Sequence, residues 1–318
     1  MLSETLVIVG VALTILVALR FRDAPSMRRA IGLGAMCGVL TLVRAEQVLL
    51  LGLLVVPLAV SAGDASTRRR LEWAGGAIGV GLLVIAPWAV YNLTRYEEPV
   101  LLTTNFGGAI AIANCHQVYQ GPRIGFWNKD CYRTESIIGV RSASVIPGTL
   151  ARRGEDGSTL DAARRDRGLD YVRAHRRDLP KVVLAREGRT WGVFRPFQQL
   201  RLDLVRGDIW PLQAGLLSYW VIAALAIGGA VILRHRRLTL WVLATFIVVV
   251  VVSTAITFGQ TRYRVPADVS LVLLAAVAAD QLFARSRNDS TSEAPKPPPR
   301  RRGGRRSRIP SVYGSTGR

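Results

Sequence analysis

The stretch with the clearest chemical potential is Arg262–Tyr263–Arg264, which lies between two long apolar runs and just before Pro266. Each arginine presents a rigid set of N–H donors that matches the oxygens of a phosphate group. Two of them at the edge of a membrane predict a site for the phosphate of a lipid, with Tyr263 orienting that group. The alternative interpretation is an interfacial anchor, in which both arginines extend to the lipid headgroups.

A second charged pair, Arg44 and Glu46, lies in a turn between two apolar segments. The segment before it, 30–43, would cover only about 21 Å as a helix, less than the roughly 30 Å hydrocarbon core. The turn is therefore expected below the outer surface of the membrane, in a recess lined by protein. Ionisable groups at that depth are functional candidates, and the alternative is that they only pair with each other. Glu46 is the best candidate for a base that deprotonates an acceptor hydroxyl.

Cys115 and Cys131 lie sixteen residues apart in a polar region that we expect outside the cell, so a disulfide is predicted. Metal binding is less favoured, because His116 is adjacent but no second ligand pair has zinc-like spacing. Cys37 lies in an apolar run and is interpreted as a small buried residue. The sequence shows no phosphate-binding loop, dinucleotide fingerprint or zinc-protease motif. We therefore expect no cofactor, no metal and no nucleic-acid partner.

The elements that would position these residues are membrane spans. The chain has 318 residues, 50% of them hydrophobic, with a mean hydropathy of +0.26 and a net charge of +20. Its apolar residues gather in runs with few charges, which is typical of spans rather than of one soluble domain. About seven transmembrane helices are predicted. They cover residues 2–19, 30–43, 47–62, 73–90, 212–233, 238–255 and 269–283.

The predicted fold class is therefore an all-α polytopic membrane protein with four parts. Residues 1–91 hold the first group of transmembrane helices, and 92–211 form an extracytoplasmic region with interfacial helices. Residues 212–284 hold the last group of transmembrane helices, and 285–318 form a basic cytoplasmic tail. The tail is rich in Pro, Ser, Gly and Arg and is predicted to be disordered, since it cannot bury a core.

Basic residues fix the expected orientation. The short connections 20–29, 66–70 and 234–237 are rich in arginine, and the tail from Arg285 holds ten Lys and Arg against two Asp and Glu. Positive charge favours the cytoplasmic side, and all four segments fall on one side when the spans alternate. We expect the protein in the inner (plasma) membrane, with its N-terminus outside and its C-terminus in the cytoplasm. An external start without a soluble leader suggests that further spans precede Met1.

The outer region is expected to be mixed α/β. Strand-like pieces occur at 99–105 ("PVLLTTN") and 109–115 ("AIAIANC"). A helix with a basic face is predicted from a capping Ser158 onward. The segment 181–199 is amphipathic, with aromatic residues that suit the membrane interface.

Seven stretches deserve comparison with known families. They are "LSETL" (2–6), "GLGAMCGVLTLVRAEQVLLL" (32–51), "APWAVYN" (86–92), "LLTTNFGGAIAIANC" (101–115), "YQGPRIGFWNKDC" (119–131), "LAREGRTWGVFRP" (184–196) and "RYRVPAD" (262–268). In this order they resemble the C-terminal half of GT-C-type membrane glycosyltransferases, above all the glycosyltransferase family 39 and protein-mannosyltransferase-like group of actinobacteria. The likeness covers most of residues 1–284. It departs at Tyr91, where the family usually has Arg, and at 43–45, where Thr-Arg-Pro is usual.

The resemblance implies transfer of a sugar from a polyprenyl-phosphate donor on the outer face of the membrane, without a nucleotide. The family's catalytic carboxylate lies in a first outer loop that no part of this sequence matches, which leaves Glu46 as a substitute. The expected partners are this donor, membrane lipids and an acceptor that the sequence does not identify. The hypothesis assigns the donor phosphate to Arg262, Tyr263 and Arg264, and the cavity and sugar contacts to Arg44, Asn105 and Asn114.

Two other functions stay open. A transporter or flippase of an anionic lipid or solute would share the spans and the cations, although no internal repeat is visible and the outer region is large for that class. An inactive, truncated membrane scaffold would share the spans alone.

Overall fold

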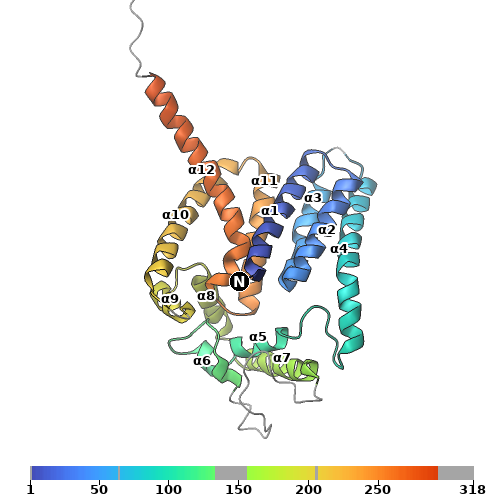
Figure 1. The fold of residues 1–318 in the computed structure, drawn as a ribbon, viewed down its shortest axis with the longest axis vertical. Helices are drawn as coiled ribbons and strands as arrows, with labels where there is room; N and C mark the ends of the chain where they lie inside the picture. Colours follow the sequence, from blue (N-terminus) through green and yellow to red (C-terminus); the bar gives the residue numbers. More distant parts are fainter. Residues whose placement is uncertain (1, 64, 133–155, 205–206, 293–318) are drawn as a thin grey trace, which may run out of the picture. The chain divides into compact units, whose positions relative to one another are not determined.

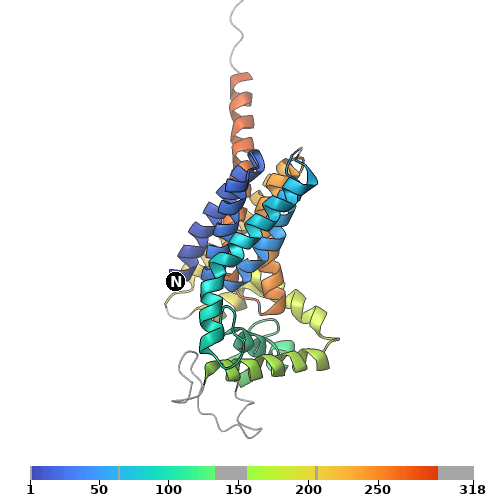
Figure 2. The same ribbon diagram turned by 90° about the vertical axis from the view of Figure 1, so that its right-hand side faces the viewer.

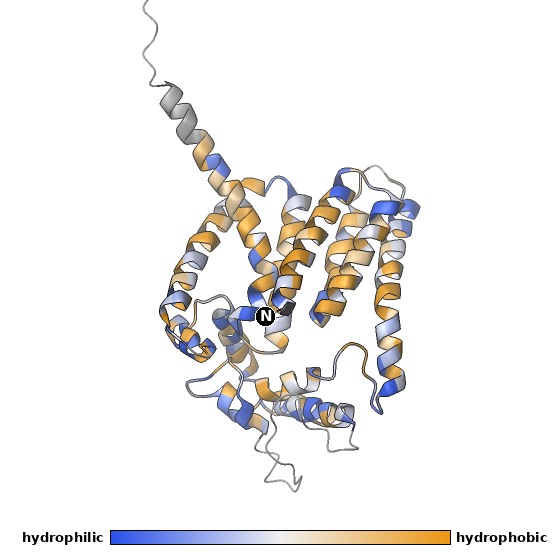
Figure 3. Ribbon diagram, in the orientation of Figure 1, coloured by the Kyte–Doolittle hydropathy of each residue, from blue (hydrophilic) through white to orange (hydrophobic). Residues whose placement is uncertain are grey.

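The computed structural model describes residues 2–63, 65–132, 156–204 and 207–292, and these contain helices but no strand. Among them, five helices are long and apolar enough to cross a membrane. They cover Ser3–Asp23, Thr67–Arg95, Trp210–Leu233, Thr239–Ile256 and Thr261–Ala284. Figure 3 shows apolar residues along the length of these helices and hydrophilic residues around their ends. An all-α membrane protein is confirmed at this level.

The N-terminal part contains the two shorter predicted spans as well as two of the long helices. Its elements are α1 (Leu2–Asp23), α2 (Met27–Val43), η1 (Ala45–Leu49), η2 (Leu51–Val55), α3 (Val56–Val60) and α4 (Thr67–Arg95). The start of α2 is set by Ser26, whose hydroxyl accepts a hydrogen bond from the Arg29 N–H. The segment predicted as a span at 47–62 lies in one helix, Ala45–Val60, whose hydrogen-bond pattern changes along its length: η1 is a 3-10 helix, η2 a π-helix and α3 an α-helix. Turns of π-helix are frequent at functional sites.

The most extensive helix contact, between α2 and α4, is made through small residues. Gly34 and Gly38 on α2 face Ala77 and Gly81 on α4, so both helices carry small residues four positions apart. A Cβ added at Gly34 would lie 1.9 Å from the carbonyl oxygen of Ala77, and one at Gly38 would lie 2.7 Å from that of Gly81. The two backbones therefore touch, and this contact positions the end of α2, where Arg44 follows.

Gly34→Ala is expected to destabilise the protein by about 1–3 kcal/mol, because the new methyl group would force the two backbones apart. Gly79→Ala on α4 is the matched control, since a Cβ there would meet nothing within 4 Å. Alanine is the better helix former by up to about 1 kcal/mol, so this control should leave stability unchanged or raise it. Thermal unfolding of the detergent-solubilised protein, followed by circular dichroism, measures both changes. Equal midpoints for the two variants would contradict the packing argument.

The region predicted to lie outside the cell, which we call the outer region, contains short helices at one end of the bundle. They are α5 (Phe106–Ala113), α6 (His116–Tyr119), α7 (Gly157–Ala174), α8 (Leu179–Thr190) and α9 (Pro196–Asp203). Figures 1 and 2 both show α7 lying across the direction of the long helices, beside α5. The predicted helix is confirmed as α7, but its cap is Asp156 rather than Ser158, because the Asp156 carboxylate accepts from the Ser158 N–H at 2.9 Å. That hydrogen bond is the largest cause of the lowered pKa of Asp156.

The predicted strands are wrong in the described residues. Residues 99–105 form no strand, and "AIAIA" (109–113) lies within α5. The reason lies in α7: the Asp161 carboxylate accepts hydrogen bonds from the N–H groups of Gly107 at 2.9 Å and Gly108 at 2.8 Å. These two donors are among those that a helix start leaves without a partner. A carboxylate distant in sequence thus caps α5, which the local alternation of Ala and Ile could not reveal.

The C-terminal part contains α10 (Trp210–Leu233), α11 (Arg237–Ile256), η4 (Thr261–Arg264) and α12 (Val265–Ser292). The chain divides into two compact units, 1–279 and 280–318. α12 continues through 285–292, where disorder was predicted, because no Gly or Pro interrupts that stretch before Pro295. The rest of the predicted tail, 293–318, lies outside the described residues.

Within the first unit, the connections divide between two ends (Figures 1 and 2). The turns from α1 to α2, from α3 to α4 and from α10 to α11 share one end, and these contain the basic segments 20–29, 66–70 and 234–237. The turn from α11 to α12 lies at the other end, near α8. One-sided basic turns are what the positive-inside rule requires of a membrane protein.

Candidate functional site

Three charged side chains gather near the ring of Tyr263, and we call Arg44, Glu46, Arg262 and Tyr263 the Tyr263 cluster. The guanidinium carbon of Arg44 lies 5.1 Å from the centroid of the Tyr263 ring, and that of Arg262 lies 5.7 Å from it. The Nε of Arg44 is 2.6 Å from a carboxylate oxygen of Glu46. The structure thus joins two segments that are far apart in the sequence and that were selected separately for their chemistry.

Arg262 is the member of the cluster with capacity for an anion. Its side chain is exposed, and no described carboxylate forms an ion pair with it. Arg44 already has Glu46 as a partner. The Phe258 ring packs edge-on against Tyr263 at 5.2 Å between centroids, which restricts the tyrosine that both guanidinium groups contact.

Arg264 is engaged in other contacts. Its Nε donates to the Asp268 carboxylate at 2.8 Å, and its guanidinium carbon lies 3.4 Å from the centroid of the Tyr219 ring on α10. A 3-10 helix turns about 120° per residue, so side chains two positions apart diverge. The predicted pair of phosphate-binding arginines is therefore divided, with Arg262 exposed and Arg264 holding η4 against α10.

Gln47 is a neighbour of the cluster in sequence that sequence analysis did not select. It directly follows Glu46, is 0% exposed, and neither polar atom of its amide has a hydrogen-bond partner within the described residues. Burying an unpaired amide costs free energy, and native proteins rarely do so without a reason. The sequence feature that could have identified Gln47 is its position at the start of an apolar run.

Arg186 on α8 joins the outer region to the bundle, and sequence analysis missed it too. It is 1% exposed and donates to the carbonyl oxygens of Ala113 at 2.7 Å and Ala255 at 2.7 Å. These carbonyls belong to the last turns of α5 and α11, where helices lack internal partners and favour a cation. Burial lowers the pKa of Arg186 to about 10, so it stays charged at neutral pH.

Asn114, predicted to contact a sugar, is also held by Arg186. Its Oδ1 accepts from Arg186 at 2.9 Å and from the Tyr119 hydroxyl at 2.8 Å, and its Nδ2 donates to the Ile110 carbonyl at 2.8 Å. It is 4% exposed, so its position favours a structural role. Asn105 is exposed at the start of α5 and makes no side-chain cap hydrogen bond. No described hydrogen bond links either asparagine to the Tyr263 cluster.

The rest of α8 contributes a second buried arginine and a half-buried carboxylate. Arg189 is 0% exposed and donates to the Ile124 carbonyl at 2.6 Å and the Gln199 side chain at 3.0 Å, and burial lowers its pKa to about 10. Glu187 accepts from Thr254 of α11 at 2.8 Å, and burial raises the pKa of this carboxyl. The sequence feature that could have identified the two buried arginines is their separation by three residues in "AREGR" (185–189). This separation places Arg186 and Arg189 on the same face of a helix.

Two glycines allow other segments of the chain to contact the backbone of α8 at Ala185 and Arg186. A Cβ at Gly259 would lie 2.2 Å from the Arg186 carbonyl oxygen, and one at Gly125, where φ is +74°, would lie 2.7 Å from the Ala185 carbonyl carbon. The Gly259 N–H donates to the Gly125 carbonyl at 2.9 Å. The segment before η4 and the loop after α6 are thus joined directly beside α8.

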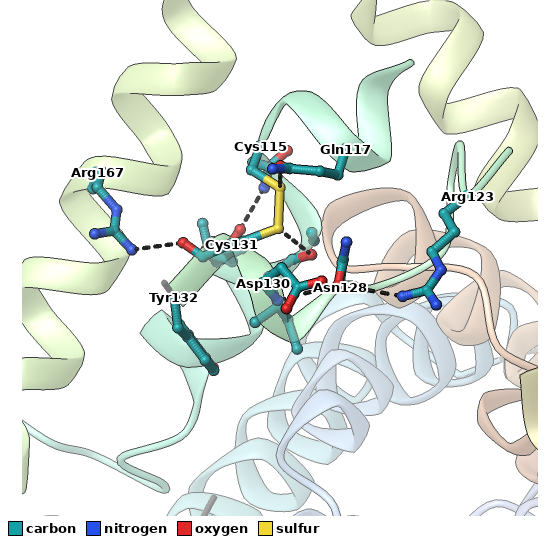
Figure 4. The surroundings of a disulfide bond; sticks show 12 residues. Cys115, Gln117, Arg123, Asn128, Asp130, Cys131, Tyr132 and Arg167 are labelled. Carbon is teal, nitrogen blue, oxygen red and sulfur yellow. Dashed lines mark hydrogen bonds between the residues drawn. A yellow bond between two sulfur atoms is a disulfide. The ribbon is translucent and has the colours of Figure 1, made fainter. Parts of the chain in front are cut away.

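The predicted disulfide between Cys115 and Cys131 is present, with 5.8 Å between the Cα atoms (Figure 4). It links the start of α6 to a segment that α7 also contacts, because Arg167 donates to the Cys131 carbonyl at 3.4 Å (Figure 4). Cys37 is free and buried, as predicted. In the part of the chain that the structure describes, no three His, Cys, Asp or Glu side chains group as metal ligands would.

Comparison of the sequence with protein-family models found no match. Comparisons with curated proteins and with solved structures found none either.

Proposed function

We propose that the chain is a membrane glycosyltransferase, or the C-terminal part of one, that moves a sugar from a polyprenyl-phosphate donor to an acceptor on the outer face of the membrane. The observation that carries this proposal is the Tyr263 cluster, in which an exposed arginine that has no carboxylate partner among the described residues shares the Tyr263 ring with an Arg44–Glu46 pair. The cluster joins the 3-10 turn η1, which follows α2, to the 3-10 turn η4, which precedes α12. The resemblance of the ordered stretches to GT-C-type enzymes supports the same conclusion.

Each member of the cluster has a role in this reaction. Arg262 binds the donor phosphate, and the Tyr263 ring holds the guanidinium groups of Arg262 and Arg44 by cation–π contact. Glu46 takes the proton of the acceptor hydroxyl as its oxygen bonds to the anomeric carbon of the sugar. The bond from that carbon to the phosphate oxygen breaks, the polyprenyl phosphate keeps the electron pair, and Arg262 stabilises the charge. Arg264 positions η4 through Asp268 and Tyr219.

The proposed orientation places this end of the bundle outside the cell. The three basic turns of the first unit lie at the opposite end, which the positive-inside rule assigns to the cytoplasm. The N-terminus would then be outside, the C-terminal tail in the cytoplasm, and the Cys115–Cys131 disulfide in an oxidising compartment.

Arg262→Ala is expected to weaken binding of a fluorescent polyprenyl phosphate about tenfold, because one charge-assisted hydrogen bond contributes roughly 1.5–3 kcal/mol. Arg95→Ala is the matched control. Arg95 is also exposed and lies over tyrosine rings, 5.8 Å from the Tyr91 centroid and 5.3 Å from that of Tyr96. Fluorescence anisotropy with the detergent-solubilised protein measures the affinities.

The same titration can also contradict the proposal. Equal losses in Arg262→Ala and Arg95→Ala, or equal binding of the polyprenol that lacks phosphate, would reject Arg262 as the phosphate ligand. Absence of binding to the unchanged protein would reject the proposed donor altogether.

A transporter or flippase of an anionic lipid is the second candidate, favoured by the 3-10 and π-helical turns η1 and η2 within the third predicted span. Turns of π-helix are frequent at functional sites. Vesicles separate the two functions, because a flippase moves the labelled lipid between leaflets without transferring a sugar.

A further inference from the structure

A hollow of about 800 Å³ lies against α8, and none of its lining residues belongs to the Tyr263 cluster. Its size falls within the range of small-molecule sites, which is roughly 300–1,000 Å³. Its walls come from α8, from the loop after α6 and from the turn between α8 and α9. It is therefore a separate feature that the proposed reaction does not use.

The residues that line the hollow include two cations and several apolar side chains. Lys181 and Arg195 are its charged residues, and no carboxylate is among the residues that line it. Leu184, Phe194 and Ile124 provide apolar surface, and the Leu184 side chain is 73% exposed. Cations beside apolar surface match a molecule that has both an anionic group and a hydrocarbon chain.

Arg195 is held in place at the cost of an unfavourable backbone conformation. Its φ of +48° is the single positive value for a non-glycine residue in the described ranges. Its Nη1 donates to the Pro122 carbonyl at 2.9 Å, and its guanidinium carbon lies 5.2 Å from the Phe194 centroid. The buried Arg189 also lies near that ring, at 5.5 Å. An arginine kept in the left-handed region by several contacts is the kind of outlier that accompanies function.

The turn that lines the hollow lies beside α10, a helix long and apolar enough to cross a membrane. The Nε1 of Trp220 donates to the Gly192 carbonyl at 3.3 Å, and a Cβ at Gly192 would lie 3.1 Å from Leu216. Leu216 and Trp220 follow Trp210 by six and ten residues, which places the contact in the N-terminal half of α10. A lipid that surrounds this helix would therefore be close to Phe194 and Arg195.

Exposed apolar side chains continue this surface away from the hollow. Val193 is 74% exposed, Phe197 62% and Trp210 66%. A set of large apolar residues around a cationic hollow is typical of a surface that faces lipid rather than water.

We propose that this hollow binds one anionic phospholipid of the surrounding bilayer, with the headgroup phosphate between Lys181 and Arg195 and an acyl chain along Leu184 and Phe194. The site is distinct from the proposed donor site at Arg262. Because Phe194 also contacts Arg189, a lipid bound there would lie against the same helix that joins the outer region to the bundle.

Native mass spectrometry of the detergent-solubilised full chain tests the proposal with dioleoyl phosphatidylglycerol as the anionic probe and dioleoyl phosphatidylcholine as the zwitterionic one. The unchanged protein should retain one molecule of the anionic lipid in preference to the other. Lys181→Gln/Arg195→Gln should reduce that retention about tenfold. Lys129→Gln/Arg177→Gln is the matched control, because it removes one exposed lysine and one exposed arginine outside the hollow.

Arg195→Gly separates binding from folding. Glycine suits a φ of +48°, so this variant should unfold at no lower temperature while it retains less of the anionic lipid. Equal retention by the Lys181/Arg195 variant and its control, or equal retention of the two lipids, would overturn the proposal. Displacement of the bound lipid by inorganic phosphate alone would also overturn it, since the site would then recognise free phosphate.

Discussion

Arg186→Met should lower the stability of the folded protein by roughly 3–5 kcal/mol, the largest effect expected of any single change here. Methionine fills a similar volume but donates no hydrogen bond. The carbonyls of Ala113 and Ala255 would stay buried without their donor, and the ends of α5 and α11 would lose a cation. Arg186→Lys should recover part of the loss, because it keeps the charge but not the planar set of donors.

Arg201→Met on α9 is the control for this change, since Arg201 is exposed. Thermal unfolding of the detergent-solubilised proteins gives the midpoints. A midpoint for Arg186→Met equal to that of Arg201→Met would mean that the buried guanidinium contributes nothing to the junction between the outer region and the bundle.

Removal of the disulfide by Cys115→Ser/Cys131→Ser is expected to destabilise the outer region by about 3 kcal/mol, as the chain-entropy argument gives for a loop of this length. The cysteines are 16 residues apart in sequence, and the loop between them carries the carbonyls that Arg189 and Arg195 contact. Hydrogen exchange of the amides in 106–132 should accelerate in the variant, while the amides of α1 and α11 should not change.

A reducing agent provides the internal control for that experiment. It should accelerate exchange in 106–132 of the unchanged protein and shift its mobility on a gel, and it should have neither effect on the double variant. If reduction leaves the unchanged protein as it was, the stabilising role of the disulfide is refuted.

Sequence patterns identified the elements whose signal is local. Long apolar runs predicted the five helices that could cross a membrane, and they also predicted the apolar stretch at 47–62 but not its 3-10 and π-helical turns. Those turns depend on backbone hydrogen bonding that composition does not encode. The helix α5 was missed because "AIAIA" alternates with a period of two, whereas Asp161, distant in sequence, supplies the cap that makes it helical.

In the candidate site, too, the sequence reveals individual residues but not the contacts between them. Arg44, Glu46, Arg262 and Tyr263 could be selected because charged residues between apolar runs are unusual. Their assembly around one ring depends on how α2 and η4 approach each other, and no pattern along the chain specifies that. The burial of Arg186 was equally hidden, because an arginine that donates to carbonyl oxygens leaves no acidic partner to find in the sequence.

The contacts of Gly125 and Gly259 with α8 have a consequence for protein engineering. Since Gly125 and Gly259 bond to each other and both press against the backbone of α8, the outer region and the turn before η4 form one interlocked piece. In a chimera that takes residues 96–204 alone from another protein, Gly259 would face a foreign backbone at the positions of Gly125 and Arg186, and the close contacts would be lost. An exchange of the outer region should therefore include the turn at 257–264.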